Sequence, residues 1–160
     1  MKFVRWRFSN KQNGMRLAVC FSYLIAFVGF LSADQKITIT GNDKMQFDIK
    51  EFTVKPGEKV ELTFKNVGEL PKLAMGHNLV ILREGVRPIK FGQKIMGLGA
   101  SPTNPLPKES LVDVIAATKL LGPGESDVIN FIAPKKAGLY QYLCSFPGHY
   151  AIMRGVLIVE

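Results

Sequence analysis

Four side chains in this sequence have the types and spacing needed to bind a soft metal ion. Cys144, His149 and Met153 follow one another at Cys-x4-His-x3-Met spacing, and His77 is the other of the chain's two histidines. One thiolate, two imidazoles and one weak thioether form the ligand set of copper sites that transfer single electrons. The residue types and their spacing therefore predict a mononuclear copper site.

Each of these residues also has an ordinary structural interpretation. A buried cysteine or methionine is most often a core residue, and a single histidine most often makes surface hydrogen bonds. The loop through Pro147 and Gly148 can return His149 and Met153 to the position of Cys144, and this combination favours the ligand interpretation. Zinc is disfavoured because structural zinc sites use four strong cysteine or histidine ligands.

A closed site of this kind predicts electron transfer and not catalysis. Four protein ligands leave no position open for a substrate, and a second metal centre would need more than the chain's two histidines. We therefore expect that the protein is not an enzyme. The alternative is a periplasmic copper carrier that delivers metal instead of electrons, although a carrier needs ligand exchange.

Residues 1–33 have the pattern of a secretory signal peptide. Residues 1–16 carry five basic and no acidic side chains, residues 17–31 are almost continuously apolar, and Ser32-Ala33 follow. Segments in this order direct export. We predict cleavage near Ala33 and a periplasmic domain over residues 34–160. The alternative is a retained membrane anchor, since the apolar run is at the short end of a bilayer span of about 17–25 residues.

Removal of this segment changes the arguments from charge and cysteine content. Five of the 21 basic residues lie in the segment, which leaves a net charge of +3 against the 13 acidic residues. A nucleic-acid partner is therefore not expected, and a membrane partner is expected only if the segment is not cleaved. Cys144 becomes the single thiol of an exported domain, which metal ligation would explain.

The remaining sequence predicts an all-β domain. Alternating apolar and polar residues, bounded by glycine, proline and asparagine, indicate short strands packed as a two-sheet sandwich. The proline- and glycine-rich residues 83–111 predict a long insertion with a short helix. The expected strands cover residues 36–40, 45–49, 51–55, 59–65, 78–82, 112–118, 126–133, 138–144 and 154–160.

The sequence resembles the cupredoxins, and among them the azurins most closely. The likeness rests on Cys144-Ser-Phe-Pro-Gly-His149-x3-Met153 and covers nearly all of residues 34–160 except the insertion. Plastocyanin-like proteins have a shorter loop between cysteine and histidine. Other azurin-like segments, in azurin order, are residues 41–47, 70–72, 75–80, 117–122 and 124–125.

The resemblance implies an eight-stranded Greek-key β-sandwich with copper near one end. It implies His77, Cys144 and His149 as equatorial ligands, Met153 as the axial ligand, and the backbone carbonyl of Gly76 as a weak axial contact.

The resemblance also implies roles around the ligands. Asn78 would tie the two ligand loops together, and backbone donors including Phe146 would hydrogen-bond the cysteine sulfur. Several positions depart from the azurin pattern. Gln35 and Glu58 replace a cysteine pair, so no disulfide is expected, and Asn66 replaces a histidine.

The expected partners are redox proteins, such as c-type cytochromes or a reductase or oxidase. They would dock transiently on an apolar patch near His149 that is formed by Phe146, Pro147, Tyr150 and Ala151.

Overall fold

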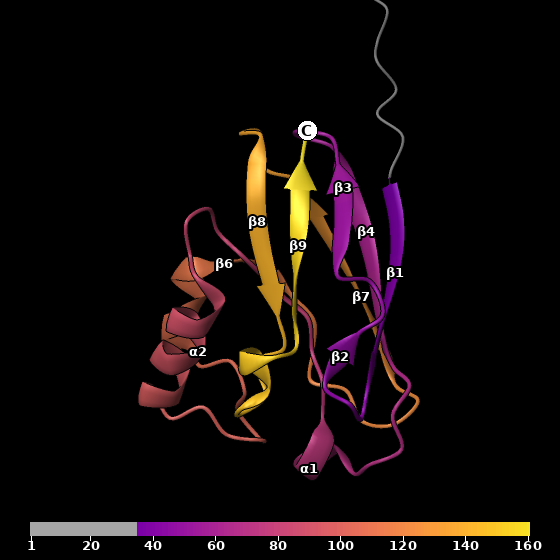
Figure 1. Cartoon of the computed structure of the whole chain (residues 1–160), viewed down its shortest axis with the longest axis vertical. Coiled ribbons are helices and arrows are strands. Elements are labelled where there is room, and N and C mark those ends of the chain that lie inside the picture. The colour runs from indigo at the N-terminus through magenta and orange to yellow at the C-terminus, as the bar shows by residue number, and fades with distance from the viewer. Residues whose placement is uncertain (1–34) are drawn as a thin grey trace, which may run out of the picture. The chain divides into compact units, whose positions relative to one another are not determined.

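The computed structural model describes residues 35–160, which form two β-sheets packed face to face (Figure 1). One sheet has the strand order β2-β1-β4-β7 and the other β3-β9-β8-β5-β6. The strands are β1 (Gln35–Asn42), β2 (Gln46–Phe47), β3 (Glu51–Val54), β4 (Lys59–Asn66), β5 (Val80–Leu82), β6 (Val114–Ala117), β7 (Ser126–Ile132), β8 (Gly138–Leu143) and β9 (Arg154–Val159).

The expected all-β sandwich is confirmed, and each expected strand has a counterpart in the structure. The described part of the chain has nine strands, one more than the eight that the resemblance implies, and β2 is only two residues long. Both sheets are mixed, because β1 pairs parallel with β4 and β3 pairs parallel with β9.

The core between the sheets follows from the alternation along the strands. β4 buries Val60, Leu62 and Phe64 and leaves Lys59 and Lys65 exposed, since side chains two residues apart in a strand share a face. β9 buries Leu157 and Val159 in the same core. This packing holds the two sheets together. Cys144 is a free cysteine, so no disulfide adds to the packing within residues 35–160.

The insertion between β5 and β6 contains α2 (Pro88–Gly97) and the 3-10 helix η1 (Lys108–Asp113). Pro88 occupies the first turn of α2, where its missing N–H costs no hydrogen bond. Phe91 and Ile95 of α2 pack in a second cluster with Val80 and Leu82 of β5. β5 is therefore covered on both faces, which explains its continuous apolar sequence. The expected helical insertion is confirmed.

Two short helices complete the fold, α1 (Lys72–Met75) and the 3-10 helix η2 (His149–Ala151). No helix within residues 35–160 is long and apolar enough to cross a bilayer. The predicted signal peptide, residues 1–33, lies outside the described residues and stays a prediction.

Candidate metal centre

Two chain segments bring the four predicted ligands to one end of the sandwich. His77 follows α1 and forms an isolated bridge with Leu121, in which each backbone N–H donates to the other residue's carbonyl, at 3.0 and 2.8 Å. Cys144 directly follows β8, His149 begins η2, and Met153 directly precedes β9. In Figure 1 η2 and α1 lie at the same end of the two sheets.

The donor atoms of His77, Cys144 and His149 form one buried cluster. Cys144 Sγ lies 3.9 Å from His77 Nδ1 and 3.6 Å from His149 Nδ1, and the ligand atoms of the three residues all lie within 4.8 Å of one another. Donors at these separations can all reach one ion through bonds of about 2.0–2.3 Å. His77 and Cys144 are 0 % exposed and His149 is 4 % exposed.

Met153 is fully buried beside this cluster. Its backbone N–H donates to the His149 carbonyl at 2.8 Å, and its carbonyl accepts from the Cys144 N–H at 3.0 Å. A Cβ atom on Gly41 would lie 2.7 Å from the Met153 methyl carbon. A glycine at position 41 therefore leaves the space that the thioether side chain occupies.

Two glycines shape the backbone around the ligands. Gly148 has a φ of 84°, a left-handed conformation that glycine adopts without steric cost, and the turn there lets His149 N–H donate to the Phe146 carbonyl at 3.0 Å. At Gly76 a Cβ atom would lie 2.5 Å from the Lys72 carbonyl oxygen. A side chain does not fit at either position without strain.

Asn78 ties the two ligand-bearing segments together, as predicted. Its Oδ1 accepts from the backbone N–H of Ser145 at 2.8 Å, and its Nδ2 donates to Ser145 Oγ at 2.8 Å. Both residues are buried. The neighbour of His77 is thereby fixed to the neighbour of Cys144.

The surroundings of the Cys144 sulfur suit a metal thiolate. Burial raises the pKa of the thiol to about 12, and hydrogen bonds from the backbone of Asn78 and Phe146 oppose this rise only in part. A bound cation would supply the charge that stabilises the thiolate. The Phe146 donor was predicted, whereas the Asn78 backbone donor was not visible in the sequence pattern.

The two histidines are held in the neutral form that binds metals. Burial lowers the pKa of His149 to about 4, and repulsion between the two rings when both are protonated adds to this shift. Burial also lowers the pKa of His77, although Asp43 and the Asn42 carbonyl oppose this effect. Each ring is therefore neutral at neutral pH and has one nitrogen lone pair available for a metal ion.

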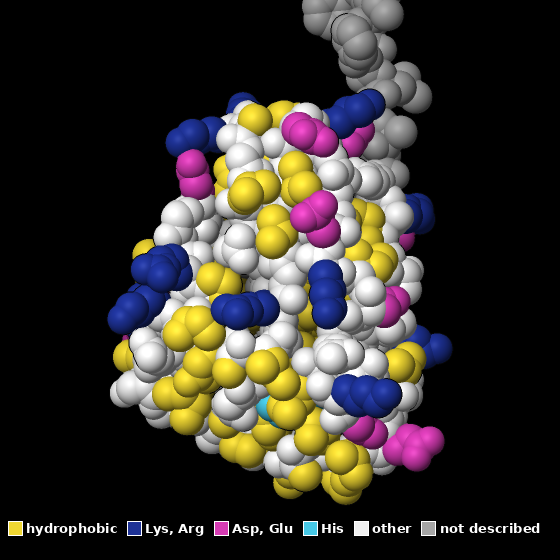
Figure 2. Space-filling view, viewed as in Figure 1, with side chains coloured by type: hydrophobic (Ala, Val, Ile, Leu, Met, Phe, Trp, Pro, Cys, Tyr) yellow, Lys and Arg dark blue, Asp and Glu magenta, His cyan; other side chains and the backbone are white. Residues whose placement is uncertain are grey.

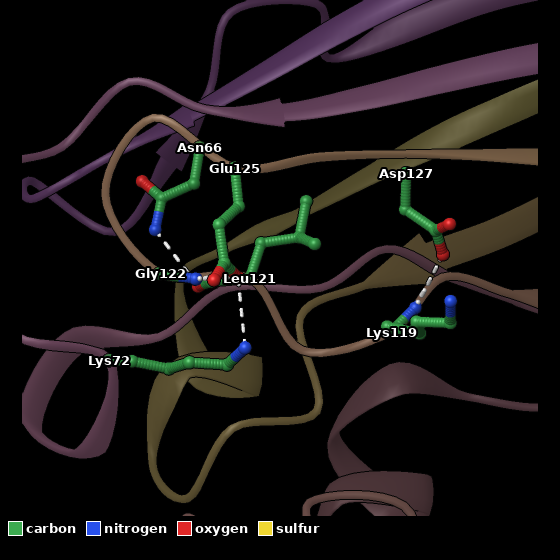
Figure 3. A network of polar contacts seen from close by, with 7 residues as sticks. All are labelled: Asn66, Lys72, Lys119, Leu121, Gly122, Glu125 and Asp127. Atoms are coloured by element: carbon green, nitrogen blue, oxygen red, sulfur yellow. Dashed lines mark hydrogen bonds and ion pairs between the residues drawn. The ribbon is translucent and has the colours of Figure 1, made fainter.

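A polar network behind His77 was missed in the sequence (Figure 3). The buried Asn66 donates from Nδ2 to the Leu121 carbonyl at 3.0 Å, the same carbonyl that accepts from the His77 N–H. Glu125 accepts from Gly122 N–H and Lys72 Nζ, both at 2.8 Å. The end of β4, α1 and the loop of residues 121–125 are thereby joined beneath His77.

The predicted docking patch is less exposed than the sequence suggests. Phe146 is buried with its ring 4.5 Å from the His149 ring, and Tyr150 is half-buried against α2. Pro147 is also half-buried, and Ala151 is exposed. Exposed apolar side chains near this end include Leu73 in α1 and Ile152 in the connection between β8 and β9, residues 144–153, which we call the ligand loop.

Comparisons with known proteins agree with this geometry. A family model described as copper binding proteins, plastocyanin/azurin family, matches residues 33–160. Azurin-2 of Alcaligenes xylosoxydans xylosoxydans is 40% identical over 128 residues, covering 78% of this chain and 97% of the relative. The azurin of Bordetella pertussis is 37% identical over 153 residues, covering 94% and 97%.

Among solved structures, the dithionite-reduced auracyanin of the photosynthetic bacterium Roseiflexus castenholzii matches with a TM-score of 0.68. It is 37% identical, and the match covers 80% of this chain and 98% of that one.

A two-sheet sandwich that clusters two histidines and one cysteine beside a buried methionine defines a cupredoxin. The chain belongs to the plastocyanin/azurin family of copper-binding proteins. The family and the donor set together assign one copper ion as the cofactor and electron transfer as the general activity.

Proposed function

We propose that the protein is a periplasmic carrier of single electrons, with copper held by His77, Cys144, His149 and Met153 and with the Gly76 carbonyl as a weak axial contact. The observation that carries the proposal is the buried cluster of Cys144 Sγ and two histidine Nδ1 atoms. Bound copper supplies a one-electron couple between Cu(II) and Cu(I). We propose no catalytic residue, because four protein ligands in a closed site leave no position at the metal for a substrate.

The chain's own residues supply a fixed and dry environment for this couple. The backbone bonds among Cys144, His149 and Met153, and the Asn78 side chain, hold the donors in place. Burial excludes water. A site that is already rigid needs little rearrangement when its charge changes by one unit, which favours fast electron transfer in both directions.

We propose that electrons enter and leave through the edge of the His149 ring. His149 is the one clustered donor with any exposure, at 4 %. Figure 2 shows hydrophobic side chains around the histidine that is visible at this end of the molecule. An apolar surface suits brief contacts with redox partners such as c-type cytochromes or a reductase or oxidase.

The test is the colour and the reversible redox chemistry of the copper-loaded protein. We expect an intense blue band from thiolate-to-copper charge transfer, which bleaches on reduction and returns on oxidation. Cys144→Ser should abolish the band. A colourless copper complex of the native protein would contradict the proposal.

A metal carrier is the second candidate, and transfer of Cu(I) to a chelator distinguishes the two. The buried site opposes ligand exchange, so we expect Cu(I) to leave over hours and to leave much faster from Met153→Ala. Rapid transfer from the native protein to a chelator of moderate affinity would favour the carrier.

The periplasmic location rests on the sequence pattern of residues 1–33. Cell fractionation together with the mass of the recovered protein tests it. We expect a soluble periplasmic protein that begins near Asp34. Full-length protein in the membrane fraction would indicate a retained anchor.

A further inference from the structure

A basic groove of about 410 Å³ lies beside the ligand loop. Residues 85–90, at the start of α2, form one side, and β8 and β9 form the other. Its charged lining residues are Arg87, Lys90 and Arg154, all of them exposed, and no acidic residue lines it. The rest of the lining is mostly apolar and includes Leu139, which is 62% exposed.

The three cations of the groove are not used in ion pairs within the described residues. The ion pairs of residues 35–160 use Lys36, Lys72, Lys94 and Lys136. Positive side chains that are not neutralised, beside an apolar wall, produce a local positive potential that attracts anionic groups.

The groove adjoins the loop that carries the proposed electron exit, because Arg154 lines it and is the next residue after that loop. Arg154 directly follows Met153 and pairs in register with Leu143, the residue before Cys144. On the other side, α2 contacts η2 so closely that a Cβ atom on Gly92 would lie 2.1 Å from the Tyr150 ring. Figure 2 shows Lys and Arg side chains over α2 and the β8–β9 region, next to the apolar area around the visible histidine.

From charge complementarity, we propose that this groove docks a redox protein that carries an acidic patch beside its own exposed redox centre. Partner carboxylates face Arg87, Lys90 and Arg154, while the apolar area meets the partner's redox edge. One electron crosses, so that the donor is oxidised by one unit as Cu(II) becomes Cu(I), and no covalent bond changes. The proposal rests on the proposed electron-transfer function and names the partner class for it.

The first test measures electron transfer from reduced cytochromes c of net negative and of net positive charge. Arg87→Glu/Lys90→Glu/Arg154→Glu should slow the second-order reaction with the acidic cytochrome by about 10-fold or more in dilute salt, which is the low end of electrostatic steering. The reaction with the basic cytochrome should not slow.

The matched control reverses three exposed lysines at the end of the sheets away from Met153, where β3 and β7 end and β4 begins, as Lys55→Glu/Lys59→Glu/Lys135→Glu. It has the same net charge as the groove variant and should keep the native rate within about twofold. Salt near 0.5 M should erase the difference between the two variants, because the screening length falls to a few ångströms. If charge reversal prevents folding, the three glutamine substitutions replace it.

The second test needs no redox activity. The acidic cytochrome is added to the isotope-labelled, copper-free protein, and amide shifts should change at residues 85–90, 139–141 and 154 and in the ligand loop. Equal slowing by both variants, or shifts elsewhere, would overturn the proposal. A blue, reversible protein without this salt effect would overturn the docking site alone, whereas a colourless protein would overturn the electron-transfer function.

Discussion

Asn78 is the residue on which the two ligand segments depend most directly. Its side chain accepts from Ser145 N–H and donates to Ser145 Oγ, and its backbone hydrogen-bonds the Cys144 sulfur. All of these groups are buried. A buried polar group that loses its partner keeps its desolvation cost. The loss of stability therefore depends on how many buried groups a substitution leaves without a partner.

The substitution Asn78→Ala should therefore cost more stability than Ser145→Ala. The first leaves both the backbone N–H and the Oγ of Ser145 without their partner, whereas the second leaves only Asn78 Nδ2 without one, and each buried group left unpaired costs about 1–3 kcal/mol. Urea unfolding of the copper-free variants measures both. An equal or larger cost for Ser145→Ala would contradict the role that we assign to Asn78.

The neutral histidines predict how the copper-free protein responds to acid. The pKa of His149 is about 4 when folded and about 6.5 when unfolded, so between these values the unfolded chain binds the proton first. Stability should therefore fall as the pH falls from about 6.5 to about 4. His149→Gln removes one titrating group and should show a shallower fall in denaturant midpoint over the same range.

Of the residue-scale features, the sequence predicts those that depend on residue type and spacing. The four ligands are predictable because few other residues could serve, whereas the Asn78 link was predicted only from the resemblance to azurins. The contact of Asn66 with Leu121 could not be predicted, since it joins residues 55 positions apart. The only available signal is a polar residue at the last, buried position of an alternating strand.

At the scale of elements, α2 fixes the position of the ligand loop. The helix buries Phe91 and Ile95 against β5. On another side, its Gly92 contacts the ring of Tyr150, the residue that follows His149. The sequence predicts a helix in this insertion, but the face against which it packs depends on tertiary structure. For this reason Tyr150, expected in an exposed patch, is half-buried instead.

The substitution Gly92→Ala should displace α2 from η2. The added Cβ would lie 2.1 Å from the Tyr150 ring, and such overpacking costs about 1–3 kcal/mol. We also expect broader or shifted His149 ring signals in the copper-free protein, measured by NMR.

Gly97→Ala in the same helix is the matched control. A Cβ atom there meets no other atom within 4 Å, and alanine is favoured over glycine in helices by about 0.5–1 kcal/mol. The control should therefore be neutral or stabilising. The double variant Gly92→Ala/Tyr150→Ala tests the contact itself. If the stability changes of the two single variants simply add in the double variant, the two residues do not interact and the contact does not position the loop.

At the scale of the whole molecule, the metal centre joins parts of the chain that are distant in sequence. His77 comes from the segment before β5, whereas Cys144, His149 and Met153 come from the connection between β8 and β9. An ion bound only by the folded state therefore stabilises the entire sandwich, by about 4 kcal/mol when free metal is 1,000 times its Kd. For a domain of this length, that gain should raise the Tm by roughly 10 °C or more.

Calorimetry with and without copper measures this gain. Cys144→Ser should lose most of it, because the thiolate is the strongest of the four donors. Reductant should leave the Tm of the copper-free protein unchanged, since Cys144 is the free cysteine of the described domain and Gln35 and Glu58 cannot form a disulfide. A copper-induced shift that survives in Cys144→Ser would place the stabilising metal elsewhere, and a reductant-sensitive Tm would contradict a fold held together by packing alone.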